Sequence, residues 1–371
     1  MSLNPVYEML LILNVLIHIY FSNLLLGGFP IMVITAWLGE RGGQVYLKDL
    51  AKTMSGVGTK VMGAAITMGF LLWLMVYSRF ARQWMHMLDA FLMGYGLMVI
   101  LVPLSFWGIY SYYTPKFPIN PFLNRRVIVG GLTVASLLGM TLLFVVAHIL
   151  TLNPDYSEYV SREGLHAALS LPTVWPRFVH IVLGSVAATG IVITLYGTLR
   201  AGRERGNHSG DGLSGTPGNT DTIRYGVAWT LAGTLPQIVV GPWLLFALPD
   251  EVRMRLVDGA SLSSMVFFVS LTLALLGLVL LNASLMVPHV RGLVWAGLGS
   301  LFLTIVTMVI VREEVRRAWM QSSVGADTFQ ELSGGVVLGV LLAILGASVV
   351  VSQILKGRFS KIQLDKTGID H

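Results

Sequence analysis

The chain has 371 residues, of which 54% are hydrophobic and 12% are charged, and its formal net charge is +6. Ordinary soluble domains carry about twice that share of charged residues, so the composition excludes a soluble enzyme. Long apolar runs recur from end to end and predict an all-α, polytopic transmembrane helix bundle. In such a protein the basic excess reflects membrane orientation rather than nucleic-acid binding.

The sequence contains no cysteine. This excludes disulfides, thiolate nucleophiles, iron–sulfur ligation and covalent haem attachment within the chain. Any metal or cofactor must therefore be held by His, Met, carboxylate or Arg side chains.

Nine apolar segments are long enough to cross a hydrocarbon core of about 30 Å at 1.5 Å per helical residue. We expect a single integral membrane domain with spans 1–5 within 7–199, a flexible cytoplasmic linker at 200–221, spans 6–9 within 222–355 and a cytoplasmic tail at 356–371. The predicted spans are 7–38, 57–79, 87–113, 125–151, 173–199, 222–247, 262–284, 290–312 and 334–355.

Loop charges predict the orientation of these spans. The loops after spans 1, 3, 5 and 7 and the tail hold most of the Lys and Arg residues, whereas "NPDYSEYVSREG" and "LPDEVRMRLVDG" on the opposite side are rich in acid. The positive-inside rule then places the N-terminus outside and the C-terminus in the cytoplasm of a bacterial inner membrane.

Histidines gather in the predicted outer half of the bundle. His18 lies in span 1, His86 at the start of span 3, His148 near the end of span 4 and His180 early in span 5. A single intramembrane His is as often a helix-to-helix hydrogen bond as a functional group. His86, beside Trp84, fits an interfacial role, but the other three together favour a shared site.

The surroundings of His180 suggest what such a site binds. Gly184, Ala187 and Ala188 follow on the same helical face. Small residues there indicate either close helix packing or room for a flat macrocycle whose iron binds the imidazole, as in helix-bundle haem proteins. Met265, at the same predicted depth in span 7, is a possible second axial ligand, although packing is the commoner role of one of 17 methionines.

A second polar group lies in "VIVREEVRRAWMQ" (309–321), where Glu313 shares a helical face with Arg316 and Arg317. Simple surface pairing is the default interpretation of such a group. A carboxylate iron ligand with guanidinium partners for haem propionates is the alternative. Sequence spacing leaves both open.

Five segments, in order, resemble subunit I of cytochrome bd quinol oxidase. "LNVLIHIYFSNLLLGGFPIMVITAWL" is similar to the first helix of that family, and "QVYLKDLAKTMSGVGTKVMGAAITMG" to its basic loop and second helix. "VVAHILTLNPD" resembles the end of its span 4, "RFVHIVLGSVAATGIVI" its F-V-H-T-V helix, and "EEVRRAW" its E-x-G-R-Q-P-W motif.

The resemblance implies b-type haems and specific roles. His180 and Met265 match the ligands of a low-spin haem b, and His18 matches the axial ligand of a second haem. Glu313 matches a carboxylate haem ligand, and Arg316 the arginine beside it.

The chain also departs from the family. The family's two span-3 glutamates are replaced by Ala90 and Met98, with Asp89 the only acid nearby, and the quinol loop is shortened to "LPDEVRMRLVDGASL". The arginine that the family resemblance predicts just before Met265 is absent. His148 stands where the family has Asn, and we infer that it fills an axial position and closes a haem to oxygen.

The leading hypothesis is a membrane cytochrome b holding two, possibly three, haems. It would pass electrons between the quinone pool and an extracytoplasmic c-type cytochrome or iron–sulfur subunit. A bd-type terminal oxidase is the nearest alternative. A transporter using a histidine proton relay is the alternative of another class, and Pro236-Gln237 and Gly241-Pro242 in span 6 resemble the broken helices of such proteins.

Overall fold

The computed structural model describes residues 5–113, 125–207, 217–287, 291–324, 337–340, 342 and 344. These residues form helices and short connections without a β-strand, which confirms the predicted all-α class. The helices, in chain order, are α1 (Pro5–Leu26), α2 (Gly28–Gly42), α3 (Val45–Tyr113), α4 (Arg125–Leu152), α5 (Pro154–Glu163), α6 (Leu165–Ser170), α7 (Val174–Asn207), α8 (Pro217–Thr234), α9 (Gln237–Ala247), α10 (Asp250–Val257), α11 (Leu262–Met286) and α12 (Arg291–Val324).

Eight segments of these described residues are long and apolar enough to cross a membrane, and they match the first eight predicted spans. Span 1 is made of α1 and α2, and span 6 of α8 and α9. Most of the ninth span lies outside the described residues, as do 208–216 of the linker and the whole tail. Val337 and Val340, which are described, pack against Leu11 and Ile12 of α1. The fold is that of a multi-pass membrane protein.

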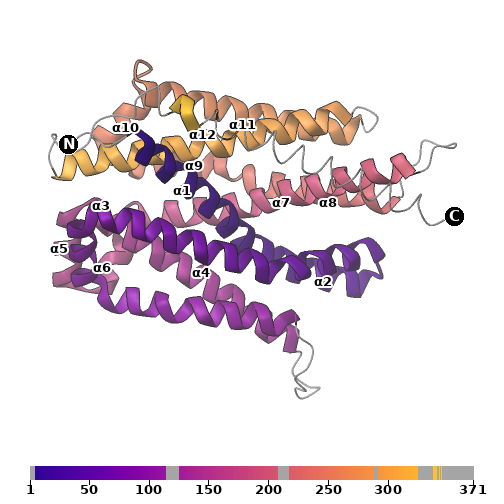
Figure 1. Cartoon of the computed structure of the whole chain (residues 1–371), viewed down its shortest axis with the longest axis horizontal. Coiled ribbons are helices and arrows are strands. Elements are labelled where there is room, and N and C mark those ends of the chain that lie inside the picture. Colours follow the sequence, from indigo (N-terminus) through magenta and orange to yellow (C-terminus); the bar gives the residue numbers. More distant parts are fainter. Residues whose placement is uncertain are drawn as a thin grey trace, which may run out of the picture.

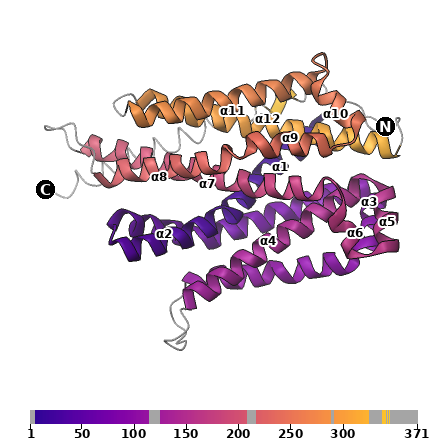
Figure 2. The ribbon, with the colours of Figure 1, turned by 180° about the vertical axis from the view of Figure 1, so that it is seen from behind.

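The long helices run side by side along one axis, and the short helices α5, α6 and α10 gather at one end (Figures 1 and 2). We call this end of the bundle the α5 end. The two acidic loops fold as α5 and α10, so they share one end, as the alternation of spans predicted. Which side of the membrane this end faces stays a prediction.

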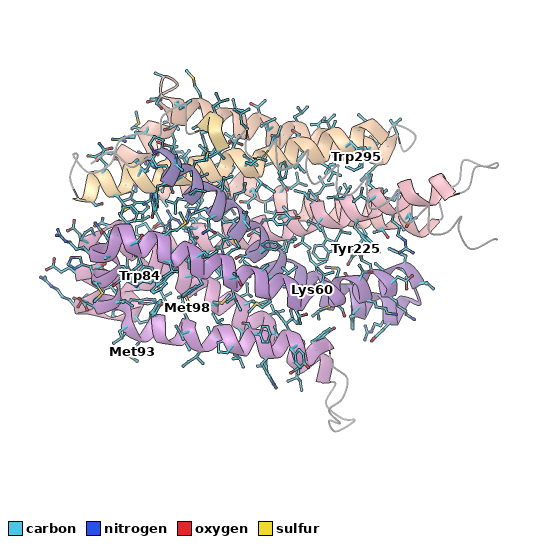
Figure 3. The ribbon with its side chains drawn as sticks, in the orientation of Figure 1. Lys60, Trp84, Met93, Met98, Tyr225 and Trp295 are labelled. Atoms are coloured by element: carbon cyan, nitrogen blue, oxygen red, sulfur yellow. The ribbon has the colours of Figure 1, made fainter. Side chains whose placement is uncertain are left out.

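Spans 2 and 3 are joined without a conventional loop. The residues from Ser78 to Leu92 include no Gly or Pro to end a helix, and helical structure continues through α3 with non-helical backbone only at Phe80 and Phe91. The two arms of α3 lie apart in Figure 3, with Lys60 on one and Met93 and Met98 on the other. Met93 is 89% exposed, as expected for a side chain facing lipid.

Small residues let α7 and α8 touch backbone to backbone. A Cβ atom on Gly233 would lie 2.4 Å from the Ala187 nitrogen, and one on Gly190 would lie 2.3 Å from the Thr230 nitrogen. Such approaches are typical of membrane helices, where close packing replaces the hydrophobic driving force. Ala187 therefore belongs to a helix contact, which is the packing interpretation left open from the sequence.

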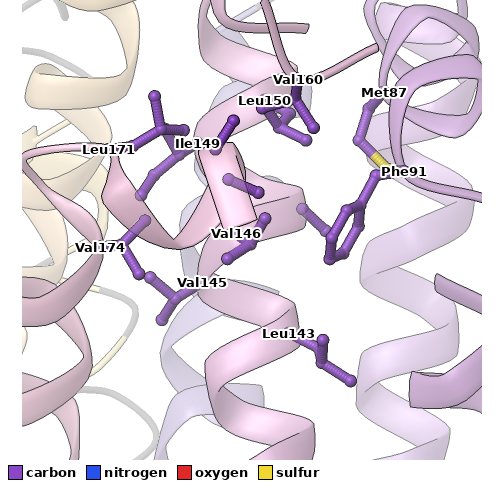
Figure 4. Packing of buried hydrophobic residues seen from close by; sticks show 13 residues of the cluster. Met87, Phe91, Leu143, Val145, Val146, Ile149, Leu150, Val160, Leu171 and Val174 are labelled. Carbon is purple, nitrogen blue, oxygen red and sulfur yellow. The ribbon is translucent and has the colours of Figure 1, made fainter. Parts of the chain in front are cut away.

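An apolar cluster fixes α4 at the α5 end. Met87 and Phe91 of α3 pack with Val146 and Ile149 of α4, and further residues come from α5, α6 and α7 (Figure 4). Val146 and Ile149 are fully buried. This packing sets the rotation of the α4 segment that carries His148.

Candidate functional site

The three histidines singled out from the sequence lie on helices that contact one another. His18 is on α1, His148 on α4 and His180 on α7, and each pair of these helices is in contact. All three side chains are half-buried inside the bundle. By contrast His86 is exposed, in agreement with the interfacial role predicted for it.

Two arginines, which the sequence alone did not single out, act electrostatically on the three histidines. The charge of Arg312 acts on His18 and His148, and the charge of Arg177 acts on His148 and His180. The two guanidinium groups also act on each other. Residues separated by more than 290 positions are therefore assembled into one polar interior region. The signal in the sequence was present, since Arg177 precedes His180 by one helical turn and Arg312 directly precedes Glu313.

The helix break in span 6 brings a glutamine onto His180. Pro236 lies between α8 and α9 and places Gln237 at the first position of α9. The Gln237 Nε2 donates to the carbonyl oxygen of His180 at 2.9 Å. The Gln237 Oε1 and the His180 Nδ1 are both buried without a hydrogen-bond partner, although the two side chains interact. If the His180 Nδ1 carries the proton, its Nε2 is the lone-pair nitrogen.

His18 is held in a ligand-like orientation. Its Nδ1 lies 3.1 Å from the carbonyl oxygen of Ala65, which can only accept, so this nitrogen carries the proton. Its Nε2 makes a longer contact of 3.3 Å with the Ser22 Oγ. Gly69 leaves space for the ring, since a Cβ there would lie 2.8 Å from the His18 Cε1. A backbone carbonyl on Nδ1 is the usual support of a metal-binding imidazole.

The ring of His148 stacks on Phe144 one turn earlier, with centroids 6.1 Å apart and planes at 3°. No described residue gives its ring nitrogens a hydrogen bond. Packing against Phe144 thus positions the imidazole, while its two ring nitrogens accept or donate no hydrogen bond among the described residues.

Glu313 and its arginines form an ionic network, closed in the sense that each charge has an opposite charge beside it, although the Arg317 Nη2 is buried without a hydrogen-bond partner among the described residues. The Glu313 Oε2 accepts from the Arg316 Nε at 2.9 Å, and Oε1 accepts from the Arg316 Nη2 and, at 3.3 Å, from the Arg317 Nε. The Arg317 Nη1 reaches Glu8 of α1 at 3.2 Å. Arg316 also lies over the Phe80 ring, 4.7 Å from its centroid. The sequence left surface pairing and haem ligation open for these residues. In the structure Glu313 and Arg316 pair with each other in the protein interior, and the ligand role implied by the family resemblance stays a prediction.

Met265 does not join the histidines. Its side chain is 54% exposed on α11, which packs mainly against α12. The neighbouring Ser263 turns inward and donates to the Glu314 Oε2 at 3.0 Å. The role of Met265 as a partner of His180 stays a prediction.

No protein-family model and no curated protein sequence matches the chain. A solved structure does: the bd oxidase from Geobacillus thermodenitrificans aligns with a TM-score of 0.63 over 98% of this chain and 98% of that chain. The chain has a bd-oxidase-like fold. At 10% sequence identity the likeness concerns the fold alone. It agrees with the order of motifs from which the resemblance was drawn.

The departures predicted within this bd-oxidase-like fold can be located. Asp89 is exposed at the α5 end of α3, whereas Ala90 and Met98 are partly buried. Met98 packs against the apolar cluster of Figure 4. The second arm of α3 therefore presents apolar side chains toward the interior, and its one carboxylate faces outward.

Proposed function

We propose that the chain is a membrane cytochrome b subunit of a bacterial inner-membrane respiratory complex, with b-type haems at the α5 end. The observation that supports this proposal is that His18, His148 and His180 lie on three mutually contacting helices of a bd-oxidase-like fold, with the charges of Arg177 and Arg312 acting on them. Imidazoles on facing helices are the usual haem ligands of helix bundles.

The residues present fit this cofactor. The His18 Nδ1 lies on a backbone carbonyl, and the His180 side chain interacts with that of Gln237, whose Oε1 is buried without a hydrogen-bond partner. Both arrangements leave Nε2 as the nitrogen that binds a metal. Carboxylate ligation by Glu313 has less support, because both of its oxygens already accept hydrogen bonds from arginines. Met265 and Glu313 are retained as the ligands that the family resemblance suggests.

Bound haem b supplies reversible one-electron transfer. The chain holds the ring through imidazoles, excludes water with the cluster around α4, and sets the local charge with Arg177 and Arg312. His148 would be a further ligand of the haem iron, and a haem with no open coordination position would transfer electrons rather than reduce oxygen. Quinone or quinol is the proposed substrate, and a c-type cytochrome or iron–sulfur subunit is the proposed partner. Since the candidate ligands gather toward one end, electron transfer here spans little of the membrane.

A visible spectrum with a pyridine haemochrome assay tests this proposal. Purified protein is expected to show a Soret band and about two haems b per chain, and His180→Ala is expected to remove one low-spin haem. His86→Ala, which changes an exposed histidine, serves as the control and keeps the full haem content. A colourless wild-type preparation would overturn the proposal and favour the proton-relay transporter.

A bd-type terminal oxidase is the second candidate, and the bd-oxidase-like fold favours it. Carbon monoxide separates the two, because it binds ferrous haem only at an open axial position. The wild type is expected to show a flat carbon monoxide difference spectrum, and His148→Ala a clear one. Oxygen uptake with carbon monoxide binding in the wild type would select the oxidase instead.

A further inference from the structure

The interior of the α5 end holds more positive than negative charge. Four arginines lie there, and two of them, Arg316 and Arg317, are neutralised by Glu313 and Glu8. A third glutamate, Glu314, accepts a hydrogen bond from Ser263 of α11. Among the described residues, no carboxylate lies within ion-pair distance of the remaining arginines, Arg177 and Arg312. These two form the arginine pair.

Burying two like charges without a counter-ion is costly, especially in a membrane protein. The positive charges of the arginine pair are only partly compensated within the chain. Arg177 lies over the Trp319 ring at 5.5 Å from its centroid, and Glu313 attracts Arg312 from beyond ion-pair distance. Both side chains keep some accessible surface although they lie inside the bundle. The arrangement is that of a site prepared for an anion.

We propose that the arginine pair is the binding site for the propionate carboxylates of a haem held by His180 or His148. This inference rests on the proposed function. Arg177 lies three residues before His180 on the same face of α7, so a carboxylate on a ring bound by this imidazole is within its reach. Arg312 approaches from α12 and acts on His148. Guanidinium groups are suited to carboxylates because they offer two parallel N–H donors.

The pair thus takes the role that the sequence gave to Arg316. Arg316 donates through Nε and Nη2 to Glu313 and through Nη1 to the Met320 sulfur at 3.2 Å. Because each of its nitrogens already donates a hydrogen bond, the Arg316 guanidinium has little capacity to bind a ligand. The arginine pair has no such hydrogen bond among the described residues.

The test compares haem b with haem b dimethyl ester, in which both propionates are neutral. The full-length chain is purified from cells unable to make haem and titrated with each compound, and the Soret band is followed. Each lost charge-assisted hydrogen bond costs about 1.5–3 kcal/mol, so the wild type is expected to bind haem b at least about tenfold tighter than the ester.

The variant R177Q/R312Q is expected to bind haem b and the ester equally. R177K/R312K keeps the charges and is expected to retain part of the preference. R253Q, which removes an arginine paired with the exposed Asp250 on α10, is the control and keeps all of it.

The outcomes separate this proposal from the one on which it rests. Equal binding of haem b and ester by the wild type, or a full preference in R177Q/R312Q, would overturn the propionate site while leaving haem binding intact. Loss of co-purified anionic lipid from R177Q/R312Q, with its haem preference unchanged, would assign the pair to a phosphate headgroup instead. A wild type that binds neither compound would refute the cytochrome itself. If R177Q/R312Q does not fold, R177K/R312K provides the test. If this variant prefers haem b over the ester as strongly as R253Q does, hydrogen bonding of the propionates by the paired N–H groups of the guanidinium is contradicted.

Discussion

Two polar regions lie at the α5 end, and they differ in how their charges are satisfied. In the ionic network, each charged side chain forms an ion pair within the chain: Glu313 with Arg316 and Arg317, and Glu8 with Arg317. In the region around the arginine pair, charged and polar groups remain open, including the Nδ1 of His180 and the Oε1 of Gln237. A closed network of buried charges holds helices in place. The open groups around the arginine pair are those for which a ligand is proposed above.

The difference separates structural from functional residues where sequence spacing could not. Glu313 and Arg316 have the ligand-like spacing, but their contacts tie α12 to itself and, through Arg317, to α1. Arg177 and Arg312 belong to no ligand motif, but their charges act on the histidines. Charge balance, rather than motif similarity, is the basis on which the site is proposed.

Breaking the closed network is expected to have the largest effect. Glu313→Ala leaves Arg316 and Arg317 buried without their shared carboxylate, and we expect it to lower the free energy of unfolding by about 3–5 kcal/mol. Denaturant unfolding of the detergent-solubilised, haem-free protein measures this. Glu158→Ala removes the carboxylate of the exposed Glu158–Arg162 pair and is expected to cost less than about 1 kcal/mol.

Substitution within the arginine pair is expected to have the opposite effect on stability. Arg312→Gln in the haem-free protein removes a buried charge that has no ion-pair partner, so it is expected to leave the free energy of unfolding unchanged or raise it. Arg316→Gln is the matched variant, one turn further along α12, and is expected to destabilise. Equal destabilisation by both variants would show that the two regions do not differ.

The glutamine beside His180 offers a finer test. Gln237→Leu removes the 2.9 Å hydrogen bond to the His180 carbonyl and the acceptor facing Nδ1. We expect a loss of about 1 kcal/mol in stability and, in the haem-loaded protein, a lower basicity of the ligating imidazole that raises the midpoint potential. Gln237→Glu keeps the acceptor and strengthens it, so it should lower the potential. A potential that does not move in either variant would limit Gln237 to helix packing.

The smallest effect is expected outside the membrane, at the turn between α10 and α11. Backbone N–H groups of Ser261 and Ala260 donate to the Asp258 carboxylate and hold its pKa below the ordinary value. Because the folded-state pKa is the lower one, this carboxylate stabilises the turn above its unfolded pKa, and the contribution is lost as the pH falls through the folded pKa. Hydrogen exchange at Ala260 and Ser261 should show lower protection in Asp258→Asn at neutral pH, with the difference disappearing in acid.

Hydropathy was sufficient to predict the class, the first eight spans and the shared end of the acidic loops, because each depends on local composition and alternation. Span topology placed the three histidines in the same half of the bundle, and the structure puts them on mutually contacting helices. Arg177 and Arg312 were passed over because they lie at the ends of the predicted spans, where an interfacial position is the default. The outward rotation of Met265 depends on how α11 packs against α12, and no periodicity in such a uniformly apolar helix reveals it. Pro236 did signal the break in span 6, but not that Gln237 would meet His180.

The fit between His18 and Gly69 has a consequence for evolution. A methyl group at position 69 would overlap the imidazole at 2.8 Å, so residue 69 cannot gain a side chain while His18 is kept. Among descendants of a common ancestor, glycine at position 69 is therefore expected wherever histidine is present at position 18. Lineages that have abandoned this imidazole are where alanine or serine should appear opposite it.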